Sequence, residues 1–213
     1  MRVLAIDPGL TRCGFSVVEG TPGRPPHLLA VGVVRTEVDL DVPRRLVVLE
    51  SEVTSLVTRW VPDVVAIERV FAQNNTPTVI GTAQAAGVAM LVGARQQIPV
   101  AQHTPSEVKA AITGNGRADK QQVGAMVARI LQLDAPPKPA DAADAVALGI
   151  CQLWRGVSSN RIEEALRRQE RNDPRSRAGA DTHSTALDRA AEISRRQMDR
   201  LAAATRRGGR RQS

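Results

Sequence analysis

Four acidic residues stand at positions where the packing of a protein core gives no reason for a carboxylate. Asp7 and Glu68 each follow a short apolar run that is typical of a buried strand. Asp141 and Asp144 lie three residues apart near the start of an alanine-rich apolar segment. Residues three apart on a helix share one face, and neighbouring strands of a sheet can end side by side. The spacing therefore allows all four carboxylates to converge.

Convergent carboxylates repel one another and raise their own pKa values unless a cation lies between them. Hard divalent ions with oxygen ligands suit such a cluster, and Mg²⁺ fits best. The histidines are scattered, the cysteines are isolated and no HExxH motif is present, which disfavours a zinc site and a Ser-His-Asp triad. These residues are His27, His103, His183, Cys13 and Cys151. The acidic residues thus predict a magnesium site.

Each carboxylate also has a purely structural interpretation. The Asp-Pro-Gly sequence at 7–9 suits a type II turn, and Glu68 could be a solvated strand end. Asp141 and Asp144 could complement the positive end of a helix dipole. These interpretations account for the residues one at a time, whereas a metal site accounts for all four together.

The elements that must position these residues follow from the apolar pattern. Strands are expected over 2–6, 14–18, 28–34, 63–67 and 98–102, and helices over 44–60, 77–96, 104–113, 119–133 and 139–154. The order, with three strands first and helical crossovers afterwards, predicts an α/β fold. Its mixed five-stranded sheet has an antiparallel meander followed by parallel strands, and helices cover both of its faces.

The helix expected over 77–96 carries a stripe of small residues at four-residue spacing. Its members are Gly81, Ala85, Ala89 and Gly93. Such a stripe lets another backbone approach closely, either in the core of the monomer or at a dimer interface.

The charge of this 213-residue chain is unevenly distributed. Residues 1–156 hold 15 basic and 14 acidic residues, whereas residues 157–213 hold 14 basic and 8 acidic residues. The sequence thus predicts a catalytic domain over 1–156 and a basic, Arg/Ala-rich extension over 157–213, mobile or partly helical. A net charge of +7 favours a polyanionic partner.

The sequence also predicts a location in the cytoplasm. Asp7 interrupts the apolar start of the chain, so no signal peptide is expected there. The longest uncharged stretch, residues 70–94, is too polar to span a membrane. Two cysteines are too few for a disulfide framework and suit a reducing environment.

Four segments together resemble one family. The segments 6–14, 66–71, 84–88 and 141–145 are similar, in order and in spacing, to the RuvC family of bacterial Holliday-junction resolvases. The resemblance covers residues 1 to about 155. It implies an RNase H-like fold, a homodimer, and magnesium-dependent cutting of two strands of like polarity in a four-way DNA junction. It also implies that the protein acts on nucleoid DNA, in recombination and in the repair of DNA damage. The branch-migration proteins RuvA and RuvB would be its partners.

The resemblance implies a metal-binding role for the acidic residues. The acidic tetrad of the family falls on Asp7, Glu68, Asp141 and Asp144, which would hold two Mg²⁺ ions, with Mn²⁺ as a substitute. Asp7 would bridge the ions. Hydrolysis at such a site leaves 5′-phosphate and 3′-hydroxyl ends that a ligase can reseal.

Other residues would contact the DNA. Phe71 matches the family's aromatic residue that stacks on a base near the crossover, although a phenylalanine can also be a core residue. Lys109 and Lys120 match lysines near the scissile phosphate, although single lysines are more often solvated. Arg117, between them, is a further candidate DNA contact. Many family members have basic residues where this chain has Asn74 and Ala86, which leaves open how many phosphates this region contacts.

Two rival functions are weaker. An ATP-binding protein of the actin and heat-shock chaperone type also begins with a strand-turn-strand phosphate loop, but needs a second half for which this chain has no room. A junction-binding protein without catalytic activity would not need the complete acidic tetrad.

Overall fold

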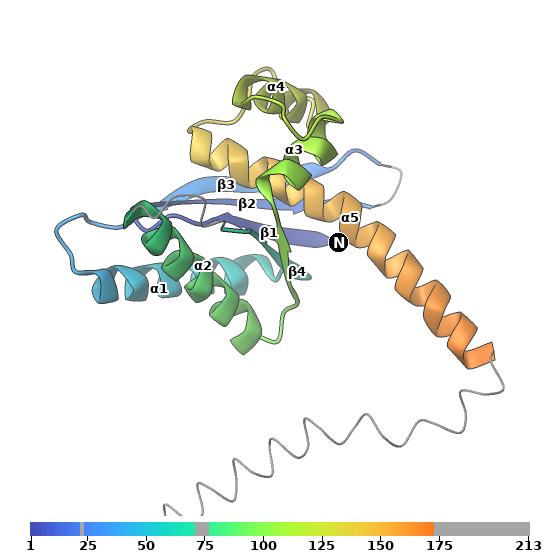
Figure 1. The fold of residues 1–213 in the computed structure, drawn as a ribbon, viewed down its shortest axis with the longest axis horizontal. Coiled ribbons are helices and arrows are strands. Elements are labelled where there is room, and N and C mark those ends of the chain that lie inside the picture. Colours follow the sequence, from blue (N-terminus) through green and yellow to red (C-terminus); the bar gives the residue numbers. More distant parts are fainter. Residues whose placement is uncertain (22–23, 71–76, 173–213) are drawn as a thin grey trace, which may run out of the picture. The chain divides into compact units, whose positions relative to one another are not determined.

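The computed structural model describes the backbone of residues 1–21, 24–70 and 77–172, and the side chains below belong to residues up to 156. The strands are β1 (Arg2–Asp7), β2 (Arg12–Glu19), β3 (His27–Arg35), β4 (Val64–Glu68) and β5 (Val100–His103). The helices are α1 (Val42–Trp60), α2 (Pro77–Arg95), α3 (Pro105–Thr113), α4 (Lys120–Ile130) and α5 (Ala140–Asn172) (Figure 1). Both sets follow the predicted order along the chain.

The five strands form one mixed sheet in the order β3-β2-β1-β4-β5. β1 pairs antiparallel with β2, and β2 with β3, whereas β4 is parallel to β1 and β5 is parallel to β4. The predicted meander followed by parallel strands is confirmed. β1 and β4 lie in the middle of the sheet and are buried on both faces, which is why their sequences are continuous apolar runs.

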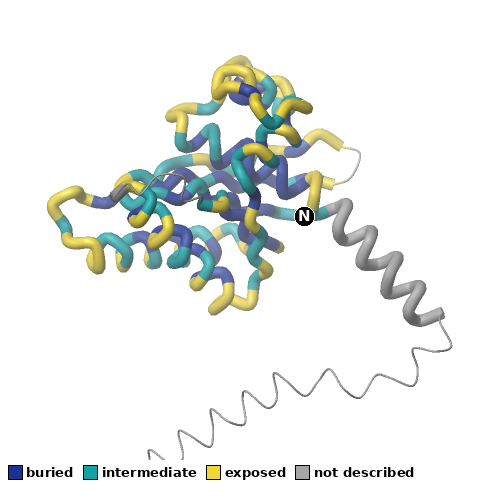
Figure 2. Tube along the Cα trace, in the orientation of Figure 1, coloured by how far each residue is buried: buried dark blue, intermediate teal, exposed yellow. Residues whose placement is uncertain are grey.

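Helices cover both faces of the sheet, as predicted. Val3 and Ala5 of β1 point to a core formed with α3, α4 and α5, whereas Leu4 and Ile6 point to a second core formed with α1 and α2. This alternation follows from the two-residue period of a strand. Figure 2 shows the sheet as the most buried layer, between partly exposed helices. β1 therefore packs against a core on each face of the sheet, and this packing positions its last residue, Asp7.

The small-residue stripe of α2 packs inside the monomer. Ala85 and Ala89 are buried against the sheet. A Cβ atom built on Gly93 would lie 2.7 Å from Cγ2 of Val100, so a larger residue would displace this side chain of β5. The core alternative is therefore correct for these residues, and the exposed apolar side chains of α2 lie on another face.

The last helix does not end where the apolar pattern ends. The sequence predicts an end near Trp154, but α5 continues to Asn172 and crosses the predicted boundary between residues 156 and 157. Its later part is rich in Arg and Glu, which favour helix, so loss of apolar periodicity did not mean loss of helix. The chain divides into two units, Met1–Asn160 with the whole sheet and Arg161–Ser213. The role of the basic extension as a separate domain stays a prediction.

No helix within the described residues combines the length and the apolar character that crossing a membrane requires.

Candidate active site

Two of the four acidic residues are placed by parallel strand pairing. Asp7 is the last residue of β1 and Glu68 is the last residue of β4. The register pairs Ile6 with Ile67, so the two carboxylates follow at adjacent positions on the carboxyl edge of the sheet. This edge is where α/β proteins place their ligands.

The other two carboxylates come from the first turns of α5, which lies close against β2. A Cβ atom on Gly14 would lie 2.2 Å from the carbonyl oxygen of Asp141, so only glycine allows this approach. Gly14 is also the strand partner of Asp7. One turn later, the buried Ser16 hydroxyl donates to the carbonyl of Ala145 at 2.8 Å. These contacts bring the amino-terminal end of α5 to the end of β1.

Electrostatics show that the four carboxylates act on one another. Burial raises the pKa of Asp7 to about 7, and the negative charges of Glu68, Asp144 and Asp141 add to the rise. Burial is also the main cause that raises the pKa of Glu68, followed by Asp144. The structure thus brings together all four acidic residues that the sequence singled out.

The two lysines predicted to contact DNA, Lys109 and Lys120, lie beside the acidic residues. A cleft of about 200 Å³ is lined by Glu68, Asp144, Lys109 and Lys120, together with Pro105, Val108, Val123 and Ala147. Lys120 Nζ lies 2.8 Å from Asp144 Oδ2, and this hydrogen bond is the main cause that raises the pKa of Lys120. Both lysines lower the pKa of Glu68. They therefore supply positive charge where the carboxylates gather.

Arg12 is a site residue that the sequence did not identify. It begins β2, and its Nε donates to Oδ2 of Asp141 at 2.6 Å. Arg12 lies within the segment 6–14, but a single arginine after a turn has no pattern that would mark it as a partner of a distant aspartate. Its role depends wholly on where α5 packs.

The donor chemistry fits a hard divalent cation, but two of the four carboxylates are paired with side-chain cations. Within the described side chains, no three acidic, histidine or cysteine residues meet in an arrangement that could hold a metal ion. Asp141 and Asp144 bond instead to Arg12 and Lys120. Burial is the main cause of the raised pKa of Asp7, and the charge of Lys120 only partly offsets the effect of the neighbouring carboxylates. Four oxygen donors of this kind suit Mg²⁺ once Asp141 and Asp144 exchange their partners.

Two predicted DNA contacts are not part of this cluster. Arg117 lies in the turn before α4 and is exposed. It lines neither the cleft of Lys109 and Lys120 nor a larger cleft that lies beside Asp7. Its backbone N–H donates to Asn115 Oδ1 at 3.0 Å, which shapes the turn. Phe71 lies outside the described residues. Base stacking by Phe71 and DNA contact by Arg117 remain predictions.

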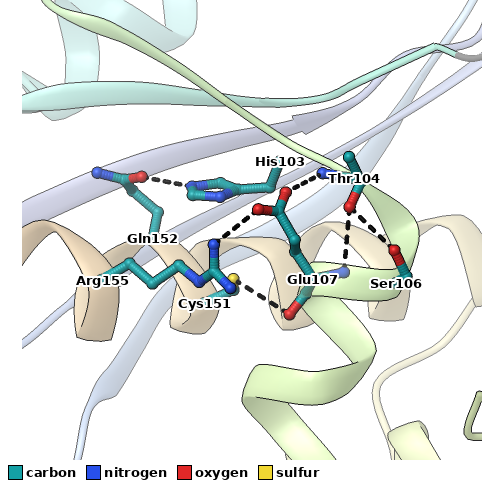
Figure 3. A network of polar contacts seen from close by, with 7 residues as sticks. All are labelled: His103, Thr104, Ser106, Glu107, Cys151, Gln152 and Arg155. Atoms are coloured by element: carbon teal, nitrogen blue, oxygen red, sulfur yellow. Dashed lines mark hydrogen bonds and ion pairs between the residues drawn. The ribbon is translucent and has the colours of Figure 1, made fainter. Parts of the chain in front are cut away.

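A polar network holds α3, which carries Lys109, against α5 (Figure 3). Thr104 and Glu107 form a reciprocal cap at the start of α3. Glu107 Oε1 also pairs with Nη1 of Arg155 on α5 at 2.9 Å. The backbone N–H of Thr104 is the main cause that lowers the pKa of Glu107 to about 2. The carboxylate thus stays ionised and ties the two helices together.

A second contact ties β5 to the same helix. His103, the strand partner of Glu68, is buried, and its Nε2 lies 2.5 Å from Oε1 of Gln152 on α5. The sheet edge that carries Glu68 and the helix that carries Asp144 are therefore linked independently of the site.

A comparison with protein families decides the relationship. The sequence profile of the family "Crossover junction endodeoxyribonuclease RuvC" matches residues 3–152. The chain belongs to the RuvC family. The family's protein from Streptomyces avermitilis is 61% identical over 166 residues, which are 78% of this chain and 94% of the relative. That from Thermobifida fusca is 61% identical over 165 residues, 78% of this chain and 91% of the relative.

Solved structures of the family agree with the fold. Thermus thermophilus RuvC is 30% identical, with a TM-score of 0.69, covering 75% of this chain and 97% of that one. The same protein in complex with a Holliday junction substrate has the same identity and TM-score, covering 73% and 94%. The predicted RNase H-like fold and the resemblance to the RuvC family are both confirmed.

Proposed function

We propose that this protein is a structure-selective endodeoxyribonuclease that resolves four-way DNA junctions by paired, symmetric hydrolysis of phosphodiester bonds. The observation that carries the proposal is the convergence of Asp7, Glu68, Asp141 and Asp144 with Lys109 and Lys120 at one end of the sheet. Family membership supports it, because the relatives are named crossover junction endodeoxyribonucleases and one was solved with a Holliday junction substrate. The nuclease would act in DNA recombination and repair.

The nuclease is proposed to depend on divalent metal, as its family does. Asp7, Glu68, Asp141 and Asp144 would hold two Mg²⁺ ions, for which Mn²⁺ is the expected substitute. When bound, such ions polarise a phosphoryl oxygen and lower the pKa of water, so that hydroxide is available near neutral pH.

The protein's own cations act on the phosphate. Lys109 and Lys120 line the cleft that also contains Glu68 and Asp144, so a phosphate bound there meets two positive charges. Positive charge fixed in place stabilises the negative charge that develops on phosphoryl oxygens during hydrolysis. Lys120 would exchange its bond with Asp144 for one with the phosphate. Hydrolysis that releases the 3′ oxygen leaves 5′-phosphate and 3′-hydroxyl ends.

A homodimer is proposed as the working unit. A two-fold axis presents two sites to symmetry-related strands, which explains paired cuts. The exposed apolar face of α2 supports this choice. Ile80, Gly87 and Leu91 lie at helical spacing on one face, with Ile80 61% and Leu91 47% exposed. A Cβ atom on Gly87 would have no neighbour within 4 Å, so a partner helix can approach there.

The setting of the reaction is proposed from the family alone. The protein would act in the cytoplasm on nucleoid DNA, with RuvA and RuvB as partners in branch migration.

The central experiment compares cleavage of a labelled four-way junction with cleavage of a linear duplex of the same sequence. We expect paired cuts in the junction alone, only with Mg²⁺ or Mn²⁺, and products that DNA ligase reseals. Asp7→Asn should abolish cutting and leave junction binding within about tenfold, because it removes a metal ligand and no phosphate contact. The matched control Asp39→Asn alters an exposed aspartate in the turn before α1. Cutting by Asp7→Asn at the wild-type rate would contradict the assignment.

A further inference from the structure

A second, larger cleft adjoins the cluster of carboxylates. Its volume is about 490 Å³, within the range of about 300 to 1,000 Å³ that is usual for binding sites of small molecules. It is lined by Asp7, Pro8, Glu68, Arg69, Val70, Thr82, Pro105 and Ser106. Glu68 and Pro105 line both clefts, so the two adjoin at these residues. The larger cleft is the natural place for the nucleotide next to the phosphate that Lys109 and Lys120 receive.

Arg69 is the cation of this cleft, and the sheet fixes its position. It follows Glu68 directly, and its backbone N–H donates to the carbonyl of His103 at 2.8 Å. This bond extends the pairing of β4 with β5 by one residue beyond the strands. The backbone of Arg69 is therefore tied to the end of β5, while its side chain is exposed.

The guanidinium of Arg69 is available for a ligand. No carboxylate among the described residues pairs with it, whereas Arg12 and Arg155 are paired with Asp141 and Glu107. The neighbouring segment 71–76 contains no acidic residue that could pair with it. Arginine presents two parallel N–H groups that match a pair of acceptors in one plane.

The rest of the lining suits a base better than a phosphate. Thr82 of α2 and Ser106 of α3 supply hydroxyl groups, and Pro8, Val70 and Pro105 supply apolar walls. The Thr82 hydroxyl donates to the carbonyl of Thr78 at 2.9 Å, which leaves its oxygen free to accept. Of the protein's own side chains, this cleft offers a phosphate one cation, whereas the smaller cleft offers two lysines. A flat base with polar edges matches the mixed lining.

We infer that Arg69 reads the base of the nucleotide next to the scissile phosphate, so that the rate of cutting depends on this base. Thr82 and Ser106 line the same subsite. Guanine is the expected preference, because its O6 and N7 acceptors match the paired N–H groups of arginine. The inference rests on the proposed junction-cutting function and adds a residue that sets its sequence specificity.

The test uses the full-length protein and four-way junctions that differ only in the two bases flanking the scissile bond. We expect the wild type to prefer guanine at one flanking position by roughly 5- to 150-fold, the discrimination of a good paired contact. Arg69→Ala should lower the rate at guanine to the rate at the other bases. Arg69→Lys keeps the charge but replaces the planar guanidinium with a flexible ammonium group, and it should lower the preference. Arg129→Ala, an exposed arginine of α4 that lines neither cleft, is the matched control and should keep it.

Salt dependence separates base reading from phosphate binding. A base contact predicts that Arg69→Ala keeps nearly the wild-type slope of log K against log salt while losing base preference. The inference is overturned if both variants keep the preference, or if the wild type shows none. It is also overturned if Arg69→Ala slows cutting equally on all junctions and flattens the slope by about 0.9, the value for one phosphate contact on duplex DNA. A wild type that cuts no junction at all would instead contradict the proposed function.

Discussion

Arg12 and Asp141 lie 129 residues apart in the sequence, yet Arg12 Nε contacts Asp141 Oδ2 at 2.6 Å. The contact joins the first residue of β2 to the first turn of α5. A second ion pair of the same kind joins Lys120 Nζ to Asp144 Oδ2 at 2.8 Å. Each aspartate of α5 is therefore neutralised by a cation from another element, and a metal ion has to compete with that cation for the carboxylate.

Removing Arg12 should strengthen metal binding to the protein without DNA. Partly exposed ion pairs contribute about 0.2 to 1 kcal/mol, so Arg12→Ala should tighten the binding of Mn²⁺ or Mg²⁺ by up to about fivefold. Isothermal titration calorimetry measures this directly. Arg2→Ala, which breaks an ion pair with Glu19 at the opposite end of β1, is the control. Weaker metal binding by Arg12→Ala would show instead that Arg12 orients Asp141 for the ion.

The stability of the metal-free protein should fall as pH rises from about 5 to about 7. The pKa of Asp7 is raised from 3.8 to about 7 and that of Glu68 is raised too, so between these values the folded chain binds more protons than the unfolded chain. The free energy of unfolding then decreases with rising pH. Glu107 acts in the opposite direction, but its pKa is lowered to about 2, so its contribution is lost only at lower pH.

Urea unfolding across this range tests the prediction. Asp7→Asn should reduce the slope of stability against pH. Mg²⁺ added near pH 7 should stabilise the wild type, because an ion that binds only the folded chain favours folding. A stability that is flat or rising between about pH 5 and 7 in the wild type would contradict the proposed origin of the shift.

The exposed face of α2 should be needed for the dimer. Ile80→Asp places a charge on this face, so we expect a monomer in size-exclusion chromatography with light scattering, together with loss of paired cuts. Val47→Asp on α1 is a matched control, because Val47 is as exposed as Ile80 but lies on another helix. A dimeric Ile80→Asp variant, or a monomeric Val47→Asp variant, would place the interface elsewhere.

The basic extension should contribute to junction binding through phosphate contacts. Residues 157–213 contain 14 arginines, of which ten lie in 173–213. If three or four of them neutralise phosphates, removal of 157–213 should flatten the slope of log K against log salt by roughly 3. Truncation after Asn172 keeps all of α5 and should give most of this effect. Cutting at saturating protein and low salt should change little, since no proposed catalytic residue lies in the extension.

An unchanged slope would contradict a DNA-binding role for the extension and would favour a docking site for a protein partner. Binding measured at several salt concentrations with full-length and truncated dimers decides between these outcomes.

The sequence by itself determined the acidic residues of the site and most of the sheet. Asp7 and Glu68 were identified because each follows an apolar run, and such a run reports burial on both faces of a strand. Asp141 and Asp144 were identified because their spacing places them on one helix face. The meander and the crossovers followed from the order of the elements. The signal for each carboxylate lies within a few residues of it along the chain.

Only the tertiary structure decided which side chains meet. Arg12 reaches Asp141 because Gly14 lets α5 approach β2, and no local pattern reports a contact across 129 residues. The cleft of Arg69 combines residues from the ends of two strands with residues from two helices, so it exists only once the elements are packed. The stripe of α2 could have faced the core or a partner, because a row of small residues permits close packing without specifying what packs there. The buried surroundings of that row settle the question.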